Sequence, residues 1–264
     1  SATLYTHFHE RPRSAARRPE RALLVGDPAP PNDPSDPLAG LPRLVWSQHE
    51  VEALSALLPG SLRLTGAQAT EQALADLAAS GGLGAFHIIH LAVHGLVDDR
   101  RPERSALVLS RQGFAAAGQE ALRGKRVADG LLSTVEIVRQ WKLDADVVTL
   151  SACESALGRE VVGEGYIGLA DAFLQAGSRS VLVSLWSVDD RATALFMHHF
   201  YSNWLGRAGG DAAAPAAGRA PAMSKAQALR EARRWMRERR DGSGRAAFAH
   251  QYYWAPFIVV GDRN

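Results

Sequence analysis

The sequence has little cysteine, no long apolar stretch and no signal for secretion. Its 264 residues contain one cysteine, so no disulfide can form within the chain, and a reducing compartment is the natural setting. No apolar run reaches the ~18 residues that a membrane-spanning helix needs. No apolar secretory segment opens the chain. We therefore expect a cytoplasmic protein without membrane contacts.

The sequence also lacks the marks of nucleic-acid and nucleotide binding. Arginines cluster within 11–21 and 230–240, but the formal net charge is only +2. No nucleic-acid-recognition motif and no interleaved aromatic residues accompany the arginine clusters. Solvent-exposed surfaces therefore explain these clusters better than a nucleic-acid partner does. The turn Gly26-Asp27-Pro28 lacks the G-x-G spacing of a phosphate-binding loop. A doubly wound nucleotide-binding domain is therefore disfavoured.

Hydrophobic residues make up 46% of the chain, which is ample for a core. Wholly apolar runs alternate with amphipathic helical patterns. This alternation predicts an α/β fold with a mainly parallel central sheet and helices on both faces. Strands are expected over 22–27, 62–65, 86–93, 106–110, 146–150, 180–186 and 252–260, and helices from Ser47, Thr70 and Ser133 and over 165–176, 191–205 and 225–239.

Two segments differ from the rest in composition. Residues 1–21 are polar and basic, and we expect them to be the end of an upstream region that precedes one domain over 22–264. Residues 206–222 are mostly Gly, Ala and Pro, which predicts a flexible linker.

The candidate chemistry lies on a histidine and the cysteine, each placed after an apolar strand. His94 follows 86–93, and Cys153 follows 146–150. Because reactive groups collect beyond the carboxyl ends of parallel strands, we expect the two side chains to meet. An imidazole increases the thiolate fraction of a nearby thiol and can later protonate a leaving amine. The pair predicts a cysteine protease dyad, with the backbone N–H groups of Gly95 and Cys153 as oxyanion donors.

Other interpretations of these residues stay open. A lone cysteine can be a buried, inert side chain, and His94 can be a structural histidine. His87, His90 and His94 also invite a metal interpretation. On a strand, however, His87 and His90 point to opposite faces, and no cluster with zinc-ligand spacing accompanies them. We therefore expect neither a metal nor an organic cofactor, and no third residue that would orient His94 is evident.

The order of motifs along the chain resembles the CHAT domain, a caspase-like cysteine protease module of the clan that includes caspases, metacaspases and separase. The resemblance covers about 23–262. Its motifs are Gly26-Asp27-Pro28, His90-Leu91-Ala92-Val93-His94-Gly95, Ser105-Ala106-Leu107-Val108-Leu109, Leu150-Ser151-Ala152-Cys153-Glu154-Ser155, Gly163-Glu164-Gly165, Gly168-Leu169-Ala170-Asp171-Ala172-Phe173, Ala176-Gly177, Ser184-Leu185-Trp186-Ser187-Val188-Asp189-Asp190 and Tyr252-Tyr253-Trp254-Ala255-Pro256-Phe257-Ile258-Val259-Val260-Gly261-Asp262.

The resemblance implies a caspase-like three-layer sandwich, with His94 as general base and acid and Cys153 as nucleophile. It implies cofactor-free endopeptidase chemistry through an acyl-enzyme on a protein substrate. It also implies an effector module of a larger, regulated bacterial protein in defence or signalling. A sensor, often a tetratricopeptide array, would lie upstream or on another chain, because the sequence shows no repeat. Low basal activity of the isolated domain is expected. The alternative is a catalytically silent, caspase-like protein-binding module.

Acidic residues near the predicted strand ends are candidates for the pocket that receives the P1 side chain, the substrate residue before the cleaved bond. Asp189 and Asp190 follow the strand 180–186, and the related run of separase, which cleaves after arginine, also carries acid. An acidic floor would favour arginine over lysine. The alternative is helix capping by Ser187 and Asp190. Glu154 and Trp186 are further P1-pocket candidates, and Glu164 is expected near the cleft.

Overall fold

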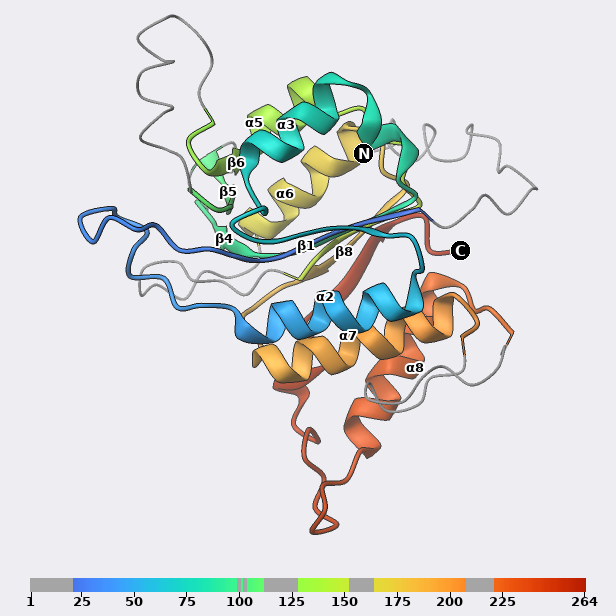
Figure 1. The fold of residues 1–264 in the computed structure, drawn as a ribbon. Helices are drawn as coiled ribbons and strands as arrows, with labels where there is room; N and C mark the ends of the chain where they lie inside the picture. Colours follow the sequence, from blue (N-terminus) through green and yellow to red (C-terminus); the bar gives the residue numbers. More distant parts are fainter. Residues whose placement is uncertain (1–20, 99–100, 102–103, 112–127, 152–163, 208–220) are drawn as a thin grey trace, which may run out of the picture.

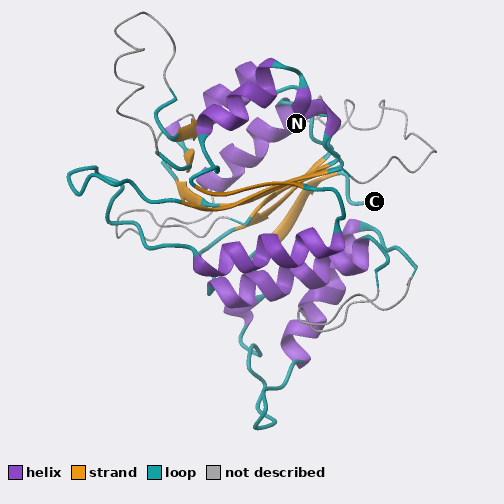
Figure 2. Cartoon of the chain, in the orientation of Figure 1, coloured by secondary structure: helices purple, strands orange, loops and turns teal. Residues whose placement is uncertain are grey.

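The computed structural model describes residues 21–98, 101, 104–111, 128–151, 164–207 and 221–264, without the side chains of 164–166. A six-stranded sheet lies between two helical layers (Figures 1 and 2). Its strands pair in parallel except for the last, which is antiparallel to its neighbour. Across the sheet the order is β2 (Leu62–Gly66), β1 (Ala22–Pro28), β3 (Ile88–Ala92), β7 (Val147–Leu150), β8 (Ser180–Ser184) and β9 (Phe257–Gly261).

Helices cover both faces of this sheet, as the alternating sequence pattern predicts (Figure 1). One layer holds α3 (Glu71–Ala79), α5 (Thr134–Gln140) and α6 (Glu164–Gln175), and the other holds α2 (Val45–Leu57), α7 (Asp190–Trp204) and α8 (Lys225–Glu238). Short 3-10 turns are η1 (Gly82–Ala85) and η3 (Gln251–Tyr253). The predicted three-layer sandwich with a mainly parallel sheet is confirmed.

The central strands are wholly apolar because both of their faces are buried. In β7, Val148 packs in the core beneath α5 and α6, whereas Val147 packs in the core beneath α2 and α7. Neither side chain is exposed to solvent. Burying a side chain of this size contributes roughly 1.5–3 kcal/mol relative to leaving it in water. The strand that leads to the cysteine is therefore held from two sides.

A second, three-stranded sheet branches from the main one. It consists of β4 (His94–Leu96), β5 (Ala106–Val108) and β6 (Leu131–Ser133), all antiparallel. The sequence predicts β5 but neither of its partners. Strands of three residues are too short to display the alternation that identifies a strand.

Two of the expected helix starts are confirmed, and a third is wrong. The Thr70 side chain accepts a hydrogen bond from Ala73 N, and Ser133 forms the predicted reciprocal capping box with Glu136. Ser47 lies inside α2, and its hydroxyl accepts from Asp27 N at 2.7 Å and donates to Leu44 O at 2.8 Å. A buried amide needs an acceptor, so this hydroxyl serves the end of β1 instead of capping the helix.

The cap of α7 also differs from the expectation. Asp189 is the capping residue, and its Oδ1 accepts from Ala192 N at 2.9 Å. Ser187 therefore does not cap the helix. Val188 is 4% exposed and packs in the core. The helix therefore begins after this buried residue.

The last two predicted strands are shorter than expected. The run expected over 252–260 begins with the 3-10 turn η3, and its strand starts only at Phe257. Pro256 has no N–H to donate to a ladder; its carbonyl accepts from Leu185 N at 3.1 Å. Strand β8 likewise ends at Ser184 rather than at residue 186.

Some expected features lie largely outside the described residues. These are the basic segment 1–21 and most of the linker 206–222. Within the described ranges, no helix is long and apolar enough to cross a membrane.

Candidate active site

His94 stands where the chain leaves the large sheet and enters the small one. It begins β4, two residues after the end of β3, and pairs with Val108 of β5. The side chain is buried, with 7% exposed. The apolar run before it becomes β3, a central strand, so the predicted position of His94 beyond a strand's carboxyl end is confirmed.

A backbone carbonyl orients the imidazole. His94 Nε2 lies 2.7 Å from the carbonyl oxygen of Pro42. A carbonyl can only accept a hydrogen bond, so Nε2 carries the proton in this contact. In the neutral ring Nδ1 is then the basic nitrogen. The sequence suggests no orienting partner for His94, and the structure supplies one from the main chain of the loop between β1 and α2.

The strand that leads to Cys153 ends beside the strand that leads to His94. β3 and β7 are paired, and Ser151 N donates to Leu91 O at 3.0 Å, one residue beyond the end of β7. Ser151 is buried and is followed by Ala152 and Cys153, which lie outside the described residues. The structure thus brings together the two strand ends that the sequence singles out, whereas the thiol itself is not described.

Burial lowers the pKa of His94 below its ordinary value. The Pro42 carbonyl and the charges of Asp190 and Asp27 act in the opposite direction. Desolvation is the largest effect because the charged ring loses its hydration. The neutral imidazole is therefore favoured near neutral pH, which suits a proton acceptor.

Asp190 lies in the first turn of α7, and its charge acts on His94. It lines a cavity of about 10 Å³, which is close to the space for one water molecule. The buried hydroxyls of Ser151 and Thr193 make no hydrogen bond to other described residues. The lining residues are Leu44, Ser47, Glu50, Ser151, Asp190 and Thr193.

The other P1-pocket candidates have different surroundings. Asp189 is exposed and caps α7. Trp186 is partly buried against the core, and its Nε1 donates to Tyr252 O at 3.1 Å. Glu154 and the side chain of Glu164 lie outside what the structure describes. Among the candidates whose side chains the structure describes, Asp190 is the one whose charge acts on His94.

His90 belongs to a buried polar network rather than to a cluster with the other histidines. Its Nε2 lies 2.9 Å from Glu50 Oε1, and its Nδ1 lies 3.4 Å from the Tyr201 hydroxyl. The same hydroxyl lies 2.6 Å from Thr149 Oγ1. In the part of the chain that the structure describes, no group of three or more His, Cys, Asp or Glu side chains is arranged to hold a metal.

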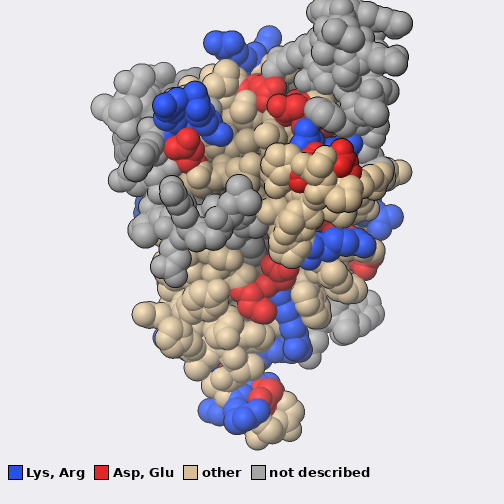
Figure 3. All heavy atoms as spheres, turned by 90° about the vertical axis from the view of Figure 1, so that its left-hand side faces the viewer, with Lys and Arg blue, Asp and Glu red and all other residues tan. Residues whose placement is uncertain are grey.

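The surface at this end of the sheet carries both signs of charge. Figure 3 looks onto the carboxyl ends of the parallel strands, where acidic and basic side chains are interspersed on the described surface. A face dominated by one sign would steer a strongly charged partner. On the described part of this surface neither sign dominates.

Comparison with solved structures identifies the fold. The chain resembles separase in the Saccharomyces cerevisiae separase–securin complex, with a TM-score of 0.51 and 14% identity over 98% of this chain and 13% of that one. The CHAT domain family model matches residues 1–262. The chain belongs to the CHAT domain family. Its fold is the caspase-like α/β fold.

Two curated relatives of this CHAT domain are much longer proteins. Tetratricopeptide repeat protein 28 of Homo sapiens is 27% identical over 286 aligned residues, which cover 97% of this chain and 10% of that protein. The Mus musculus protein of the same name is 26% identical, with the same coverage. The CHAT domain thus spans about a tenth of the length of the relatives it matches.

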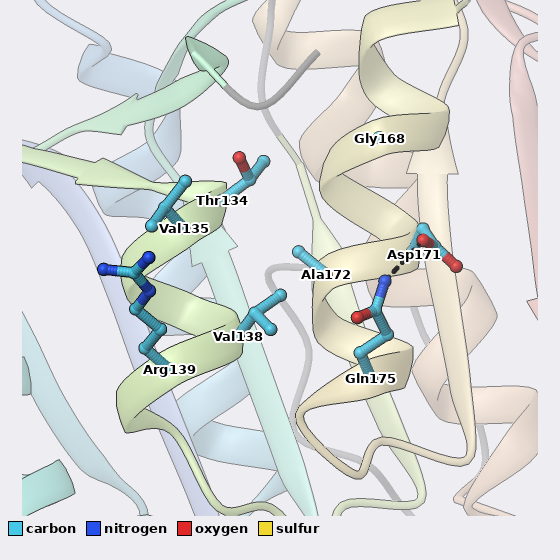
Figure 4. Close-up of a pocket in the computed structure, with 8 residues that line it drawn as sticks. All are labelled: Thr134, Val135, Val138, Arg139, Gly168, Asp171, Ala172 and Gln175. Atoms are coloured by element: carbon cyan, nitrogen blue, oxygen red, sulfur yellow. Dashed lines mark hydrogen bonds between the residues drawn. The ribbon is translucent and has the colours of Figure 1, made fainter.

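A larger groove of this CHAT domain lies between α5 and α6, in the other helical layer from α2 and α7. It has a volume of about 390 Å³. Figure 4 shows Val138 and Ala172 facing each other across it, with Gln175 bonded to Asp171 and Arg139 directed away. None of the predicted site residues lines this groove. The lining residues are Thr134, Val135, Val138, Arg139, Gly168, Asp171, Ala172 and Gln175.

Sequence reasoning missed three groups at the CHAT site: Pro42, Asp27 and Glu50. The Pro42 carbonyl has no side-chain signature, so no sequence signal marks it. Asp27 ends an apolar strand, and the rule that chemistry collects at carboxyl ends could have drawn attention to it. Glu50 sits on the buried side of α2, where its charge breaks the apolar pattern of the helix.

Proposed function

We propose that this chain is a cysteine endopeptidase that cleaves a specific protein partner through His94 and Cys153. The observation that carries the proposal is the contact between His94 Nε2 and the Pro42 carbonyl, at a strand end beside Ser151. Cys153 follows Ser151 by only two residues in the sequence, and this short separation supports the proposed pairing with His94. A buried imidazole with an oriented base nitrogen is the partner that a thiol nucleophile needs.

The proposed chemistry has two stages. His94 Nδ1 takes the thiol proton while Sγ of Cys153 attacks the scissile carbonyl, and the same nitrogen gives the proton to the leaving amine. Water then attacks the thioester with His94 as base, which releases the acid product and restores the thiol. Backbone N–H groups of Gly95 and Cys153 are the proposed donors to the oxyanion. Pro42 accepts from Nε2 and keeps the ring in this tautomer.

Substrate choice is proposed to include a basic P1 residue, with Asp190 as the acidic partner. Asp190 is partly buried, lies beside Ser151 in the cavity lining and exerts its charge on His94. A carboxylate binds the planar guanidinium of arginine through two hydrogen bonds, which favours arginine over lysine. Asp189 and Trp186 are secondary candidates, because Asp189 caps α7 and Trp186 donates a hydrogen bond to the Tyr252 carbonyl. Glu154 is a further secondary candidate.

The wider setting is also a proposal. We infer that the domain is the effector module of a larger protein, because it covers about a tenth of its curated relatives. Both relatives are named as tetratricopeptide repeat proteins, which supports a neighbouring protein-interaction region as the regulator. A bacterial defence or signalling role and a cytoplasmic location stay predictions.

Labelling with a peptide acyloxymethyl ketone that carries arginine at P1 tests the activity. We expect modification of Cys153, found by mass spectrometry, and none in Cys153→Ala. His94→Ala should slow labelling by about 10²-fold or more. Val138→Ala, in the groove between α5 and α6, is the matched control and should react like the wild type. Absence of labelling in the longest available chain would favour the silent binding module.

Cleavage itself is read from two further measurements, the first of which adds the variant Asp190→Asn. A positional peptide library should show hydrolysis after arginine, reduced in Asp190→Asn; hydrolysis only after Leu, Met or Asp would exclude the basic preference. Incubation with proteins encoded beside this one, followed by mass spectrometry, should reveal one discrete cut. The isolated domain should be less active than the full-length protein.

A further inference from the structure

The loop over 29–44, which carries Pro42, is fastened by two ion pairs. At its middle, Asp36 pairs with Arg111 at 2.6 Å, and both side chains are mostly buried. At its carboxyl end, Arg43 pairs with Asp27 at the end of β1; Arg43 Nε lies 3.2 Å from Asp27 Oδ1, and Nη2 contacts Oδ2. The guanidinium and carboxylate thus meet through two hydrogen bonds, a geometry that restricts both partners.

Asp27 is held in an unusual backbone conformation to make this contact. It is the non-glycine residue with a left-handed backbone among the described residues, with φ of 43°. Its N–H donates to Ser47 Oγ at 2.7 Å, and it is only 2% exposed. Strained residues persist where their surroundings fix them, and they concentrate at functional sites.

We propose that Asp27 and Arg43 are positioning residues that hold the Pro42 carbonyl against His94. Arg43 is joined directly to Pro42, so fixing its guanidinium on β1 limits where the neighbouring carbonyl can point. That carbonyl is 2.7 Å from His94 Nε2. The chain of contacts from Asp27 through Arg43 and Pro42 to His94 sets the tautomer of the ring. The inference rests on the proposed function, since positioning matters most if His94 is the base.

The two charges of the pair act on His94 in opposite directions. Asp27 and Asp190 both favour the protonated ring, whereas burial disfavours it. Removing the carboxylate of Asp27 should therefore lower the pKa of His94 further. Removing the cation of Arg43 leaves the Asp27 charge uncompensated and should raise the pKa of His94.

Two substitutions separate positioning from general stabilisation. Asp27→Asn keeps a side chain that tolerates the left-handed conformation and removes only the charge. Arg43→Ala removes the guanidinium, and Arg43→Lys restores the positive charge without the paired hydrogen bonds to Asp27. We expect Asp27→Asn and Arg43→Ala to lower kcat by about 10- to 100-fold with little change in KM, with partial recovery in Arg43→Lys. The pH profiles of kcat/KM should shift in opposite directions in the first two variants.

Asp36→Asn is the matched control because it breaks the other ion pair of the same loop, at the loop's middle. It should reduce kcat much less than Asp27→Asn. Equal losses would reduce the Asp27–Arg43 pair to a general loop anchor and overturn the proposal. Should Asp27→Asn not fold, Arg43→Lys decides, since it keeps a cation beside the buried Asp27 carboxylate and the Arg43 side chain is 54% exposed.

A second readout does not depend on proteolysis. In a Cys153→Ala background, the ¹⁵N chemical shifts of the His94 ring report which nitrogen carries the proton. We expect Nε2–H in the parent and a mixed tautomer in Arg43→Ala. The same change of tautomer, together with no peptide cleavage by the chain that retains Cys153, would retain the positioning and reject the proposed function. An unchanged tautomer and unchanged pH dependence in both variants would reject the positioning.

Discussion

Tyr201 shows what a single residue contributes beneath the candidate site. Its hydroxyl is fully buried and lies between Thr149 on β7 and His90 on β3. Burial raises the pKa of this phenol, so the hydroxyl stays protonated and able to donate. Because His90 also contacts Glu50 of α2, one side chain of α7 connects both central strands with the neighbouring helix.

We expect Tyr201→Phe to destabilise the fold by about 1–3 kcal/mol. The substitution keeps the ring but leaves buried polar atoms on Thr149 and His90 without this partner. Urea denaturation at pH 7 measures the loss. Tyr252→Phe, at a 41% exposed tyrosine, should change the free energy of unfolding by less than about 0.5 kcal/mol. Equal effects of the two variants would contradict the role given to the buried network.

Individual residues differ in how far the sequence reveals them. His94 could be placed because it follows an apolar run that must be a buried strand. The Pro42 carbonyl could not, because every residue has one and only the fold decides where it points. Glu50 could be noticed as a charge on an apolar helix face, but its partner His90 lies 40 positions further along the chain.

Among the elements, α3 fastens the segment that returns to the small sheet. Glu71, in its first turn, accepts a hydrogen bond from Gly130 N at 2.8 Å and is 7% exposed. Burial raises its pKa to about 7, and the charges of Glu136 and Asp129 act in the same direction. The folded-state pKa therefore exceeds the ordinary value of 4.5.

This shift predicts a pH-dependent gain from Glu71→Gln. The stability that Glu71 provides is complete below pH 4.5 and is lost as the pH rises through about 7, because the folded state binds the extra proton. Gln keeps an acceptor for Gly130 N–H and has no charge. At pH 8 the variant should be more stable than the wild type by about 1–3 kcal/mol, with little difference at pH 5.

Thermal unfolding at the two pH values provides the measurement. Glu238→Gln is the control, since Glu238 is 57% exposed on α8 and pairs with arginines, which stay charged at both pH values. It should show the same small change at both pH values. A Glu71→Gln variant that is less stable than the wild type at pH 8 would show that the ionised carboxylate, rather than its neutral form, holds Gly130.

Local signals predict an element well when they are self-contained. The capping box of Ser133 and Glu136 lies within four residues and fixes the start of α5. The start of α7 depends on where Val188 is buried, and the strands β4 and β6 depend on pairing with β5. Such distant contacts have no local pattern, so these features could not be predicted.

At the scale of the whole molecule, contacts at the amino end of the sheet couple β7, which precedes Cys153, with β8, which precedes Asp190. The connection from α5 to β7 touches the connection from α6 to β8, with Leu143 N bonded to Ala176 O at 2.8 Å and Arg179 N bonded to Ala145 O at 2.9 Å. Gly177 sits at this crossing with φ of 116°. A Cβ there would lie 2.3 Å from Leu143 O, which is too close for any real contact.

Gly177→Ala should therefore destabilise the entire domain, although it lies at the opposite end of the sheet from His94. Both the left-handed backbone and the clash disfavour the side chain, so we expect a loss of about 1–3 kcal/mol. At about 2–4 °C per kcal/mol for a domain of this size, the melting temperature should fall by several degrees. Gly40→Ala is the matched control, since its Cβ would meet nothing within 4 Å.

The contacts between the segments before β7 and β8 predict that the loss of stability in Gly177→Ala affects the whole sheet. If β7 and β8 unfold together with the rest of the sheet, circular dichroism and the reactivity of Cys153 should report the same midpoint for Gly177→Ala. The rate of Cys153 labelling per folded molecule should equal that of the wild type, because the strand ends at His94 and Ser151 are unchanged. A lower labelling rate at a temperature where the variant is fully folded would show that strain at the amino end reaches the site directly.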